Sequence, residues 1–365
     1  MRAVVYQAPG KVALADVPEP HLQADTDAVV RVSLAAICGT DLHMLRGHVP
    51  GIEPGTVLGH EFVGVVVEVG SAVRRVRVGD TVMSSDFTAC GTCWWCRRGE
   101  HWHCPERQFF GTGAAFGKPL PGAQAEYVRV PFADTTLEPL PFGVCPTAAL
   151  LIGDNLATGW VSVQRGGVRP GDVVAIVGGG PVGQLASLSA QTVGAGVVVV
   201  CDPVDSRRDL AARHGAVSVT PEELTVVVGE LTEGRGSDVV VEAVGSPSGL
   251  ELALTAVRRR GTVVSAGAHT EPTWPLPLAR AFAQEVTLTF AIGDSIRTRS
   301  QLASLVAAHV LDPSIVVTGK LALTEAVVGY RDLQEFGAMK VLLDPEEDGD
   351  RGSATLWCTA AQTGA

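Results

Sequence analysis

The sequence predicts an α/β protein with two domains, one a mainly antiparallel β domain and the other a doubly wound parallel sheet. The chain has 365 residues, more than the roughly 100–200 of a single domain. Its first third consists of short β-type segments separated by glycine and proline, whereas its middle alternates apolar runs with helix-type segments. Continuous apolar runs are typical of parallel strands buried on both faces.

Composition and charge narrow the class of protein. Hydrophobic residues make up 46% of the chain, which excludes disorder as its main state. The net charge of −11 repels phosphate backbones and anionic lipid, so we expect neither a nucleic-acid nor a membrane partner. No apolar run approaches the ~20 residues of a membrane span, and the N-terminus has the pattern of a strand and not of a leader. We therefore expect a cytoplasmic protein.

The first predicted domain occupies residues 1–154. Its clearest strands are Val29–Leu34, Gly64–Val69 and Thr81–Ser84. The connections between such strands are too short for regular βαβ crossovers, which indicates antiparallel pairing.

The second predicted domain occupies residues 155–291, where strands alternate with helices. One helix runs from a glycine-rich turn to about Val193, and another covers Ser206–His214. Residues 292–344 have a mixed pattern and are expected to complete the first domain. Residues 345–365 are acidic and then small and polar, which predicts a flexible tail. The predicted strands of the second domain are Val173–Val177, Val197–Cys201, Asp238–Val241 and Thr262–Ser265.

The glycine-rich turn follows the first strand of the second domain. Gly178, Gly180 and Gly183 fit the pattern G-x-G-x-x-G, with Pro181 and Val182 between the last two glycines. The first glycine permits a tight turn, the second lets the backbone approach a pyrophosphate, and the third lets helix and strand pack closely. The motif predicts a dinucleotide site. A purely structural turn is the alternative, which the flanking strand and helix disfavour.

An acidic residue follows the glycines at the distance that a dinucleotide site requires. Asp202 ends the next predicted strand, close to the roughly 20 positions expected. A carboxylate accepts a ribose 2′-hydroxyl but repels a 2′-phosphate, so NAD is favoured over NADP. Arg207 and Arg208 leave NADP open, because an arginine can accommodate that phosphate. A solvated helix start is the simpler interpretation of both, and Arg207 is also a candidate contact to the adenosine.

Four of the eight cysteines lie close together in the spacing C-x2-C-x2-C-x7-C, in a lobe at about residues 86–108. In a reducing compartment such spacing indicates a metal site more often than disulfides. Four thiolates close a tetrahedral zinc site with no open position, which makes the site structural. An iron–sulfur cluster is the alternative, but its usual run has a shorter last spacing. The four cysteines are Cys90, Cys93, Cys96 and Cys104.

A dispersed set of polar residues forms a third candidate site. Cys38, Thr40 and His43 lie on one short segment, and His60 and Asp154 follow later in the chain. Cysteine, histidine and carboxylate all bind zinc, and a catalytic zinc takes three protein ligands and a water. Each residue taken singly also has a structural interpretation, as a core cysteine, a satisfied buried histidine or a helix cap.

Taken together and in their order along the chain, the motifs resemble those of the zinc-dependent medium-chain alcohol dehydrogenases. The resemblance covers nearly the whole chain. It implies a GroES-like catalytic domain and a Rossmann domain. It also implies hydride transfer between NAD(H) and a small alcohol, or a carbonyl compound in the reverse direction. The matching segments are Cys38–Asp41, Gly59–Glu61, Val78–Asp80, the four-cysteine lobe, Asp154–Gly159 and Gly178–Gly183.

The resemblance implies two zinc ions, one structural and one catalytic. It makes Cys38, His60 and Asp154 the catalytic ligands and Glu61 a neighbouring carboxylate that can approach the metal. The best-known members have cysteine as the third ligand, so Asp154 is a departure. This aspartate is similar to that of a bacterial branch with formaldehyde dehydrogenase-like members.

The resemblance implies further roles in the two domains. Thr40 and His43 form a proton relay, and Thr158 and Lys340 contact the cofactor, with Lys340 near the pyrophosphate. Phe87 is a candidate for the wall of the substrate pocket, although a core aromatic is an equal interpretation. The family forms homodimers or homotetramers, often through the edge of the Rossmann sheet.

Three alternative functions stay open. Polyol, amino-acid and sugar-alcohol dehydrogenases share these ligands, so the motifs do not identify the substrate. A zinc-free quinone or enoyl reductase is disfavoured by the ligand set, and a non-catalytic nucleotide sensor is disfavoured by the relay. The sequence assigns no role to Cys145, Cys201 and Cys358.

Overall fold

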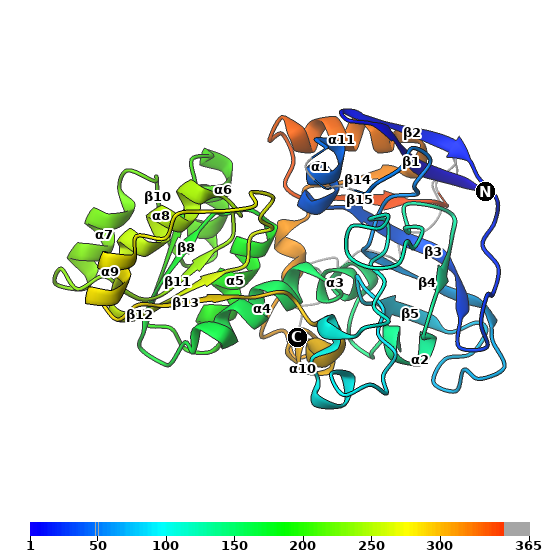
Figure 1. Ribbon diagram of the computed structural model, residues 1–365, viewed down its shortest axis with the longest axis horizontal. Coiled ribbons are helices and arrows are strands. Elements are labelled where there is room, and N and C mark those ends of the chain that lie inside the picture. The colour runs from blue at the N-terminus through cyan, green and yellow to red at the C-terminus, as the bar shows by residue number, and fades with distance from the viewer. Residues whose placement is uncertain (48, 50, 347–365) are drawn as a thin grey trace, which may run out of the picture. The chain divides into compact units, whose positions relative to one another are not determined.

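The computed structural model describes residues 1–47, 49 and 51–346. The chain forms two compact units, which Figure 1 shows as ribbons. The first unit comprises Met1–Asp154 together with the chain from Asp294 onward, and the second comprises Asn155–Gly293. Of the predicted tail, Pro345 and Glu346 are described and the rest lies outside the described residues, as does Cys358.

A seven-stranded sheet forms the centre of the first unit. The long strand β3 pairs antiparallel with β4, β6 and β15, and the parallel pairing of β14 with β15 is the exception to the antiparallel pattern. A separate hairpin consists of β1 (Arg2–Ala8) and β2 (Lys11–Asp16). The sheet contains β14 (Gly319–Ala322), β15 (Val341–Asp344), β3 (Ala28–Ile37), β4 (Phe62–Val69), β5 (Thr81–Ser84) and β7 (Leu137–Pro139) in spatial order, with β6 (Tyr127–Val130) beside β3.

The helices of the first unit begin and end beside this sheet. Pro146 starts α3 at a position where its missing N–H costs nothing, and the Asp294 carboxylate caps α10 by accepting the Arg297 N–H at 3.0 Å. The α-helices are α1 (Gly39–Leu45), α2 (Ala133–Thr136), α3 (Pro146–Ile152), α10 (Ser295–Ala307) and α11 (Ala326–Gln334). The short 3-10 helices are Cys96–Arg98, His101–His103, Pro313–Val316 and Leu323–Glu325.

Six parallel strands form the sheet of the second unit. Their order places β9 on one side of β8 and β11 on the other, so the winding reverses between β8 and β11 (Figure 1). This is the doubly wound order of a Rossmann fold, and the predicted fold class is confirmed. In spatial order the strands are β10 (Val217–Val219), β9 (Val197–Cys201), β8 (Val173–Val177), β11 (Ser237–Glu242), β12 (Val257–Ser265) and β13 (Thr287–Phe290).

Helices bury both faces of this parallel sheet. Successive side chains of a strand point to opposite faces, so Ile176 packs in one core with Ala186 of α5 while Ala175 packs in the other with Ala253 of α8. Burial on both sides explains why the strands are continuous apolar runs. The helices are α4 (Asn155–Gly166), α5 (Pro181–Thr192), α6 (Asp205–Arg213), α7 (Leu224–Leu231), α8 (Pro247–Ala256) and α9 (Leu278–Ala283).

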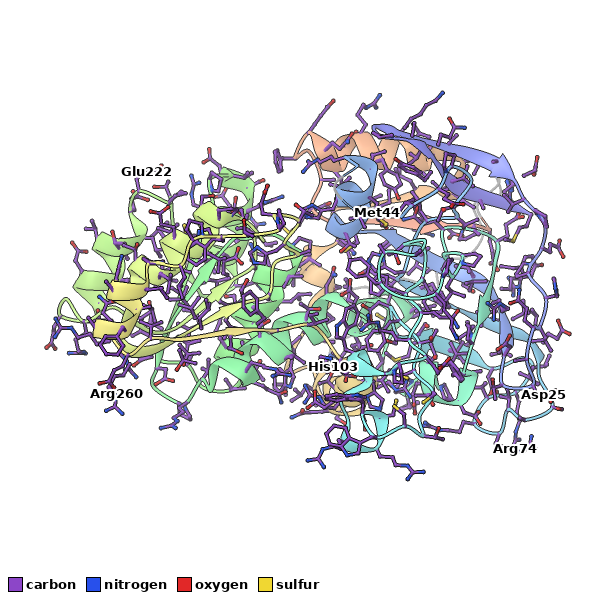
Figure 2. All side chains as sticks on the ribbon, in the orientation of Figure 1. Asp25, Met44, Arg74, His103, Glu222 and Arg260 are labelled. Carbon is purple, nitrogen blue, oxygen red and sulfur yellow. The ribbon has the colours of Figure 1, made fainter. Side chains whose placement is uncertain are left out.

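Side chains divide by polarity between core and surface. Figure 2 labels the buried Met44 and the exposed charged residues Asp25, Arg74, Glu222 and Arg260. Across the part of the chain that the structure describes, no helix combines the length and the apolar character that crossing a membrane would need.

Candidate active site

The first cluster of functional side chains lies where β3 ends and α1 begins. Cys38 is the residue that precedes α1, and its side chain is buried. The Asp41 carboxylate accepts the Cys38 backbone N–H at 2.9 Å, which holds the turn in place. The thiol therefore has a fixed position at the start of the helix.

Two other segments bring their side chains to this thiol. His60 and Glu61 stand just before β4, and Asp154 follows α3. The Cys38 Sγ lies 3.7 Å from Asp154 Oδ2, and His60 Nε2 lies 3.5 Å from the same oxygen. One donor atom from each of these four residues lies within 4.8 Å of the others.

The donor set of this cluster fits a zinc ion. His60 is almost completely buried, yet its Nε2 has no hydrogen-bond partner among the described residues, and neither does Glu61 Oε1. A buried polar atom without a partner is costly, whereas a metal ion would satisfy it. Thiolate, imidazole and carboxylate are the ligand types that zinc takes in proteins.

A chain of polar side chains supports His60 from behind. Its Nδ1 lies 3.5 Å from Asp41 Oδ1, the arrangement that commonly orients a metal-binding histidine. Asp41 Oδ2 accepts a hydrogen bond from Gln124 Nε2 at 3.1 Å, and the Tyr330 hydroxyl donates to Gln124 Oε1 at 2.9 Å. Sequence analysis missed these three residues. Asp41 lies within the Cys38 motif, but Gln124 and Tyr330 are too distant in sequence to give a signal.

Burial and neighbouring charges shift the proton affinities of the cluster. Burial opposes a charge on His60, but Asp41 outweighs it with help from Asp154, so the pKa of His60 is raised well above its usual value. Burial raises the pKa of Glu61 to about 7, although the ammonium of Lys340 opposes this shift. Both pKa values shift because the two groups lie in a low-dielectric interior, where an unpaired charge is unfavourable.

Thr40 and His43 both lie on α1. They are three residues apart, which puts them on one face of the helix, and both are half-buried. A hydroxyl and an imidazole in this arrangement form a short polar track that begins two residues after the Cys38 thiol.

The four-cysteine lobe forms a second compact donor set. The sulfurs of Cys90, Cys93, Cys96 and Cys104 lie within 4.8 Å of one another, with Cys93 and Cys96 at 3.5 Å and Cys90 and Cys96 at 4.0 Å. A tetrahedron with Zn–S bonds of about 2.3 Å has sulfurs about 3.8 Å apart. The spacing therefore fits a zinc ion held by four thiolates.

Burial and hydrogen bonds shift the pKa values of the lobe thiols in opposite directions. Burial acts to raise the pKa of Cys90, but hydrogen bonds from Thr92 and Cys93 outweigh it and lower this pKa to about 6. Burial raises the pKa of Cys96 and of Cys104. Only a cation at the centre would stabilise all four thiolates together.

The glycine turn of the second unit has the geometry that its sequence predicts. Gly178 has a φ of 98°, and a Cβ on Gly183 would lie 1.8 Å from the Gly178 carbonyl oxygen. A Cβ on Gly180 would meet nothing within 4 Å, so that face of the turn is open. Pro181 and Val182 then form the first turn of α5.

Asp202 stands directly after β9 and is buried beside the glycine turn. Its Oδ2 accepts the Gly179 N–H at 2.8 Å, and its Oδ1 accepts the Val204 N–H at 2.8 Å. Arg207 Nη1 donates to Oδ2 at 3.3 Å. Arg208 instead donates to the backbone carbonyl of Asp202 at 2.7 Å and pairs with Asp205. The carboxylate is thus fixed, with one arginine against it.

Comparison with known proteins decides the family. Residues 24–141 match the alcohol dehydrogenase GroES-like domain, and residues 181–308 match the zinc-binding dehydrogenase family. The chain belongs to the zinc-binding alcohol dehydrogenases. It is therefore an oxidoreductase that uses a nicotinamide cofactor on alcohols, and the predicted reaction class is confirmed.

Individual relatives agree with this family. The structure of alcohol dehydrogenase TADH from Thermus sp. ATN1 is 40% identical, has a TM-score of 0.89 and covers 94% of this chain and 99% of its own. An alcohol dehydrogenase of Cupriavidus necator is 32% identical over 94% of this chain and 99% of its own length. A Sinorhizobium meliloti structure with NADP bound is 28% identical, with a TM-score of 0.82 and coverage of 94% and 99%.

The structure bears on two residues with roles predicted from the sequence, Lys340 and Phe87. Lys340 is completely buried, and its ammonium pairs with Glu61, one of the four clustered donor residues. For Phe87 the structure favours the core interpretation over the pocket interpretation. It is completely buried and packs edge-on against Trp102, at 5.3 Å between ring centroids, in the same core as Cys96 and Cys104.

The aromatic ring that lies beside His60 of this cluster belongs to Phe109. Its centroid is 5.2 Å from that of His60.

Of the unassigned cysteines, Cys201 is buried, and burial raises the pKa of its thiol to about 12. Cys145 is half-buried at the start of α3.

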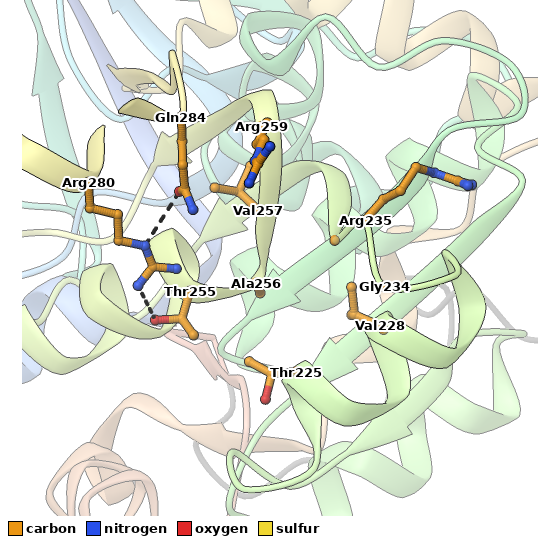
Figure 3. A pocket seen from close by; sticks show the side chains of 12 residues that line it. Thr225, Val228, Gly234, Arg235, Thr255, Ala256, Val257, Arg259, Arg280 and Gln284 are labelled. Carbon is orange, nitrogen blue, oxygen red and sulfur yellow. Dashed lines mark hydrogen bonds between the residues drawn. The ribbon is translucent and has the colours of Figure 1, made fainter. Parts of the chain in front are cut away.

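A cavity of about 290 Å³ in the second unit lies away from the nucleotide turn (Figure 3). Its lining includes Gly236 and Val257, which stand where β11 and β12 begin, and also Arg235, Arg259 and Arg280. The dinucleotide of a doubly wound sheet binds at the opposite, carboxyl ends of the strands. The cavity is therefore not the cofactor site.

Proposed function

We propose that this dehydrogenase oxidises a small alcohol with NAD⁺, using a catalytic zinc at Cys38, His60 and Asp154 and a structural zinc at the four cysteines. The observation that carries the proposal is the buried, unpartnered His60 Nε2 beside a thiol and a carboxylate. The two buried donor sets lie on different segments of the first unit, so they support two separate zinc ions.

The side chains around the catalytic set supply orientation and proton transfer. Bound zinc would polarise the alcohol oxygen, and bound nicotinamide would accept the hydride. Asp41 holds the His60 ring in place. Thr40 accepts the proton of the substrate hydroxyl, and His43 carries it toward solvent. Glu61, paired with Lys340, places a second carboxylate next to the ligands without leaving its charge unpaired.

The preference for NAD rests on Asp202. Its carboxylate would accept the 2′-hydroxyl of the adenosine ribose and repel a 2′-phosphate. Arg207 weakens that repulsion because it pairs with the same carboxylate, and the S. meliloti relative has NADP bound. We propose that NAD is preferred and that the margin over NADP is moderate.

The second unit also supports a homodimer or homotetramer. Strand β13 is the last strand of its sheet, so one of its edges has no paired strand in the described chain. Phe290 at its end is 60% exposed, and Leu278 and Phe282 of α9 are 71% and 88% exposed. An open edge with exposed apolar side chains is suited to pairing with a second copy.

The proposed function is tested by following NADH at its absorbance band with zinc-loaded protein and a panel of alcohols. The panel contains primary, secondary, aromatic and polyol substrates and formaldehyde hydrate, each with NAD⁺ and with NADP⁺. We expect turnover on one substrate class, with a larger kcat/KM for NAD⁺. A larger kcat/KM for NADP⁺ would contradict the role given to Asp202. Turnover confined to polyols would favour the sugar-alcohol alternative.

The relay is tested by replacing Thr40. We expect Thr40→Ala to lower kcat about 100-fold, because a positioned proton-transfer group contributes roughly 10²–10⁴-fold, while Thr40→Ser retains most of the activity. The matched control is Thr56→Ala, on an exposed hydroxyl of the same unit that donates to a backbone carbonyl. Wild-type turnover in Thr40→Ala would show that the proton takes another route.

A further inference from the structure

A buried carboxylate that the proposed mechanism does not use lies at the end of β11. Glu242 is completely buried, and its Oε1 accepts the N–H groups of Val244 at 2.8 Å and Gly245 at 2.6 Å. Its Oε2 accepts the hydroxyl of Ser265, the last residue of β12, at 2.9 Å. Glu242 thus connects the loops that leave two neighbouring strands.

These two loops lock together through their backbones. The Glu242 carbonyl accepts the Ala266 N–H at 2.7 Å. A Cβ on Gly267 would lie 1.9 Å from the Gly245 nitrogen, and a Cβ on Gly245 would lie 2.5 Å from the Ala268 carbonyl oxygen. Because neither glycine has room for a side chain, the two loops, residues 243–246 and 266–269, pack rigidly against each other. We call this paired segment at the carboxyl ends of β11 and β12 the lip.

His269 stands on this lip with one nitrogen engaged and one available. Its Nε2 lies 2.6 Å from Ser265 Oγ and 3.5 Å from Glu242 Oε2. Ser265 donates its single proton to the carboxylate, so its oxygen accepts the Nε2–H of His269. The His269 side chain is 22% exposed, and no described residue is a hydrogen-bond partner of its Nδ1. The ring also packs edge-on near Phe290.

The lip lies on the half of the sheet opposite Asp202. The glycine turn after β8 is the pyrophosphate position, and Asp202 after β9 faces the adenosine ribose. On the other side of β8 come β11 and then β12 (Figure 1). With strands about 4.8 Å apart, the end of β12 is roughly 10 Å from the turn, the reach of one nucleoside beyond the pyrophosphate.

We propose that His269 Nδ1 hydrogen-bonds the second nucleoside of the bound dinucleotide, the one that carries the nicotinamide, and that Ser265 and Glu242 orient the ring for this contact. The inference rests on the proposed nicotinamide-dependent function. It adds a residue that positions the half of the cofactor where hydride is exchanged.

The test compares two ligands that differ in that half of the cofactor. Dissociation constants for NADH and for ADP, which keeps the adenosine and both phosphates but lacks the whole second nucleoside, are measured by calorimetry on the zinc-loaded enzyme. In His269→Gln the amide replaces Nε2 and leaves Nδ1 without a substitute, whereas in His269→Asn the amide replaces Nδ1. We expect His269→Gln to weaken NADH binding about 3- to 10-fold, the effect of one hydrogen bond, with ADP binding unchanged. His269→Asn retains most of the NADH affinity.

The control variant is His214→Asn, at the half-buried end of α6, which should bind both ligands as the wild type does. Equal losses for NADH and ADP in His269→Gln would overturn the proposal, because they would show that the ring only supports the loops. Unchanged NADH binding in this variant would also overturn it. If the wild-type enzyme bound neither ligand, the proposed function itself would fail, which is a different result from failure of the His269 contact alone.

Discussion

Cys38→Ser is expected to lower kcat at least about a thousand-fold. The proposed catalytic zinc stabilises transition-state charge by several kcal/mol, and each 1.36 kcal/mol corresponds to a factor of about ten in rate. A serine hydroxyl is a far poorer zinc ligand than a thiolate, so the metal would be lost or displaced. Zinc analysis should then find about one ion per chain, against the two ions expected for the wild type.

The same variant should remain folded. Serine is close to cysteine in size, and the turn at residue 38 is held by the backbone N–H to Asp41, which the substitution leaves in place. Thermal unfolding and turnover of Cys201→Ser serve as the matched control, since this cysteine is also buried and lies in the other unit. Full turnover in Cys38→Ser with one zinc per chain would contradict the proposed ligand set.

Cys104→Ser is expected to have the opposite profile, with a large loss of stability. Structural zinc sites contribute folding free energy directly. The lobe core around Cys104 contains Phe87, Ala89, Cys96 and Phe109, and its ordering depends on the four-sulfur site. A loss of about 3 kcal/mol would lower Tm by roughly 4 °C, because a chain of 365 residues has an unfolding entropy of about 0.8 kcal/mol/K. The measurement is differential scanning calorimetry, with zinc content determined in parallel.

The control for the lobe is His103→Ala. This residue is exposed, and its ring packs beside Trp95 at 5.1 Å between centroids. His101 is already engaged, because its Nδ1 lies 3.1 Å from Asp294 Oδ1. We expect His103→Ala to keep both zinc ions and the wild-type Tm. If Cys104→Ser melted normally while losing turnover, the division between structural and catalytic zinc would be reversed.

The sequence predicted most of the fold because its strands have simple patterns. Thr81–Ser84, Val173–Val177 and Val197–Cys201 begin and end at the predicted residues. The parallel strands are buried on both sides, so their sequences are unbroken apolar runs. The weak edge strand β13, with exposed or half-buried residues throughout, has no such run and no separate prediction.

The site residues were predictable only where both their chemical type and their spacing along the chain are distinctive. Cysteine, histidine and aspartate ligands are rare enough as a set to be recognised, and the glycine pattern is constrained by close backbone contacts. Gln124 and Tyr330 were not predictable, because their role comes from tertiary contacts with Asp41 and each other. Phe87 shows the converse, since an aromatic residue near metal ligands in sequence proved to be the core of the neighbouring lobe.

The chain of polar contacts from His60 to Tyr330 bears on how the enzyme is made. Tyr330 and Lys340 both come from the segment that returns to the first unit after the whole nucleotide-binding unit. During synthesis, the proposed zinc ligands Cys38, His60 and Asp154 are made well before either residue emerges. The pocket cannot acquire its final support until nearly the entire chain has left the ribosome. The proposed catalytic zinc site therefore acquires its complete set of supporting contacts only late in the synthesis of this enzyme.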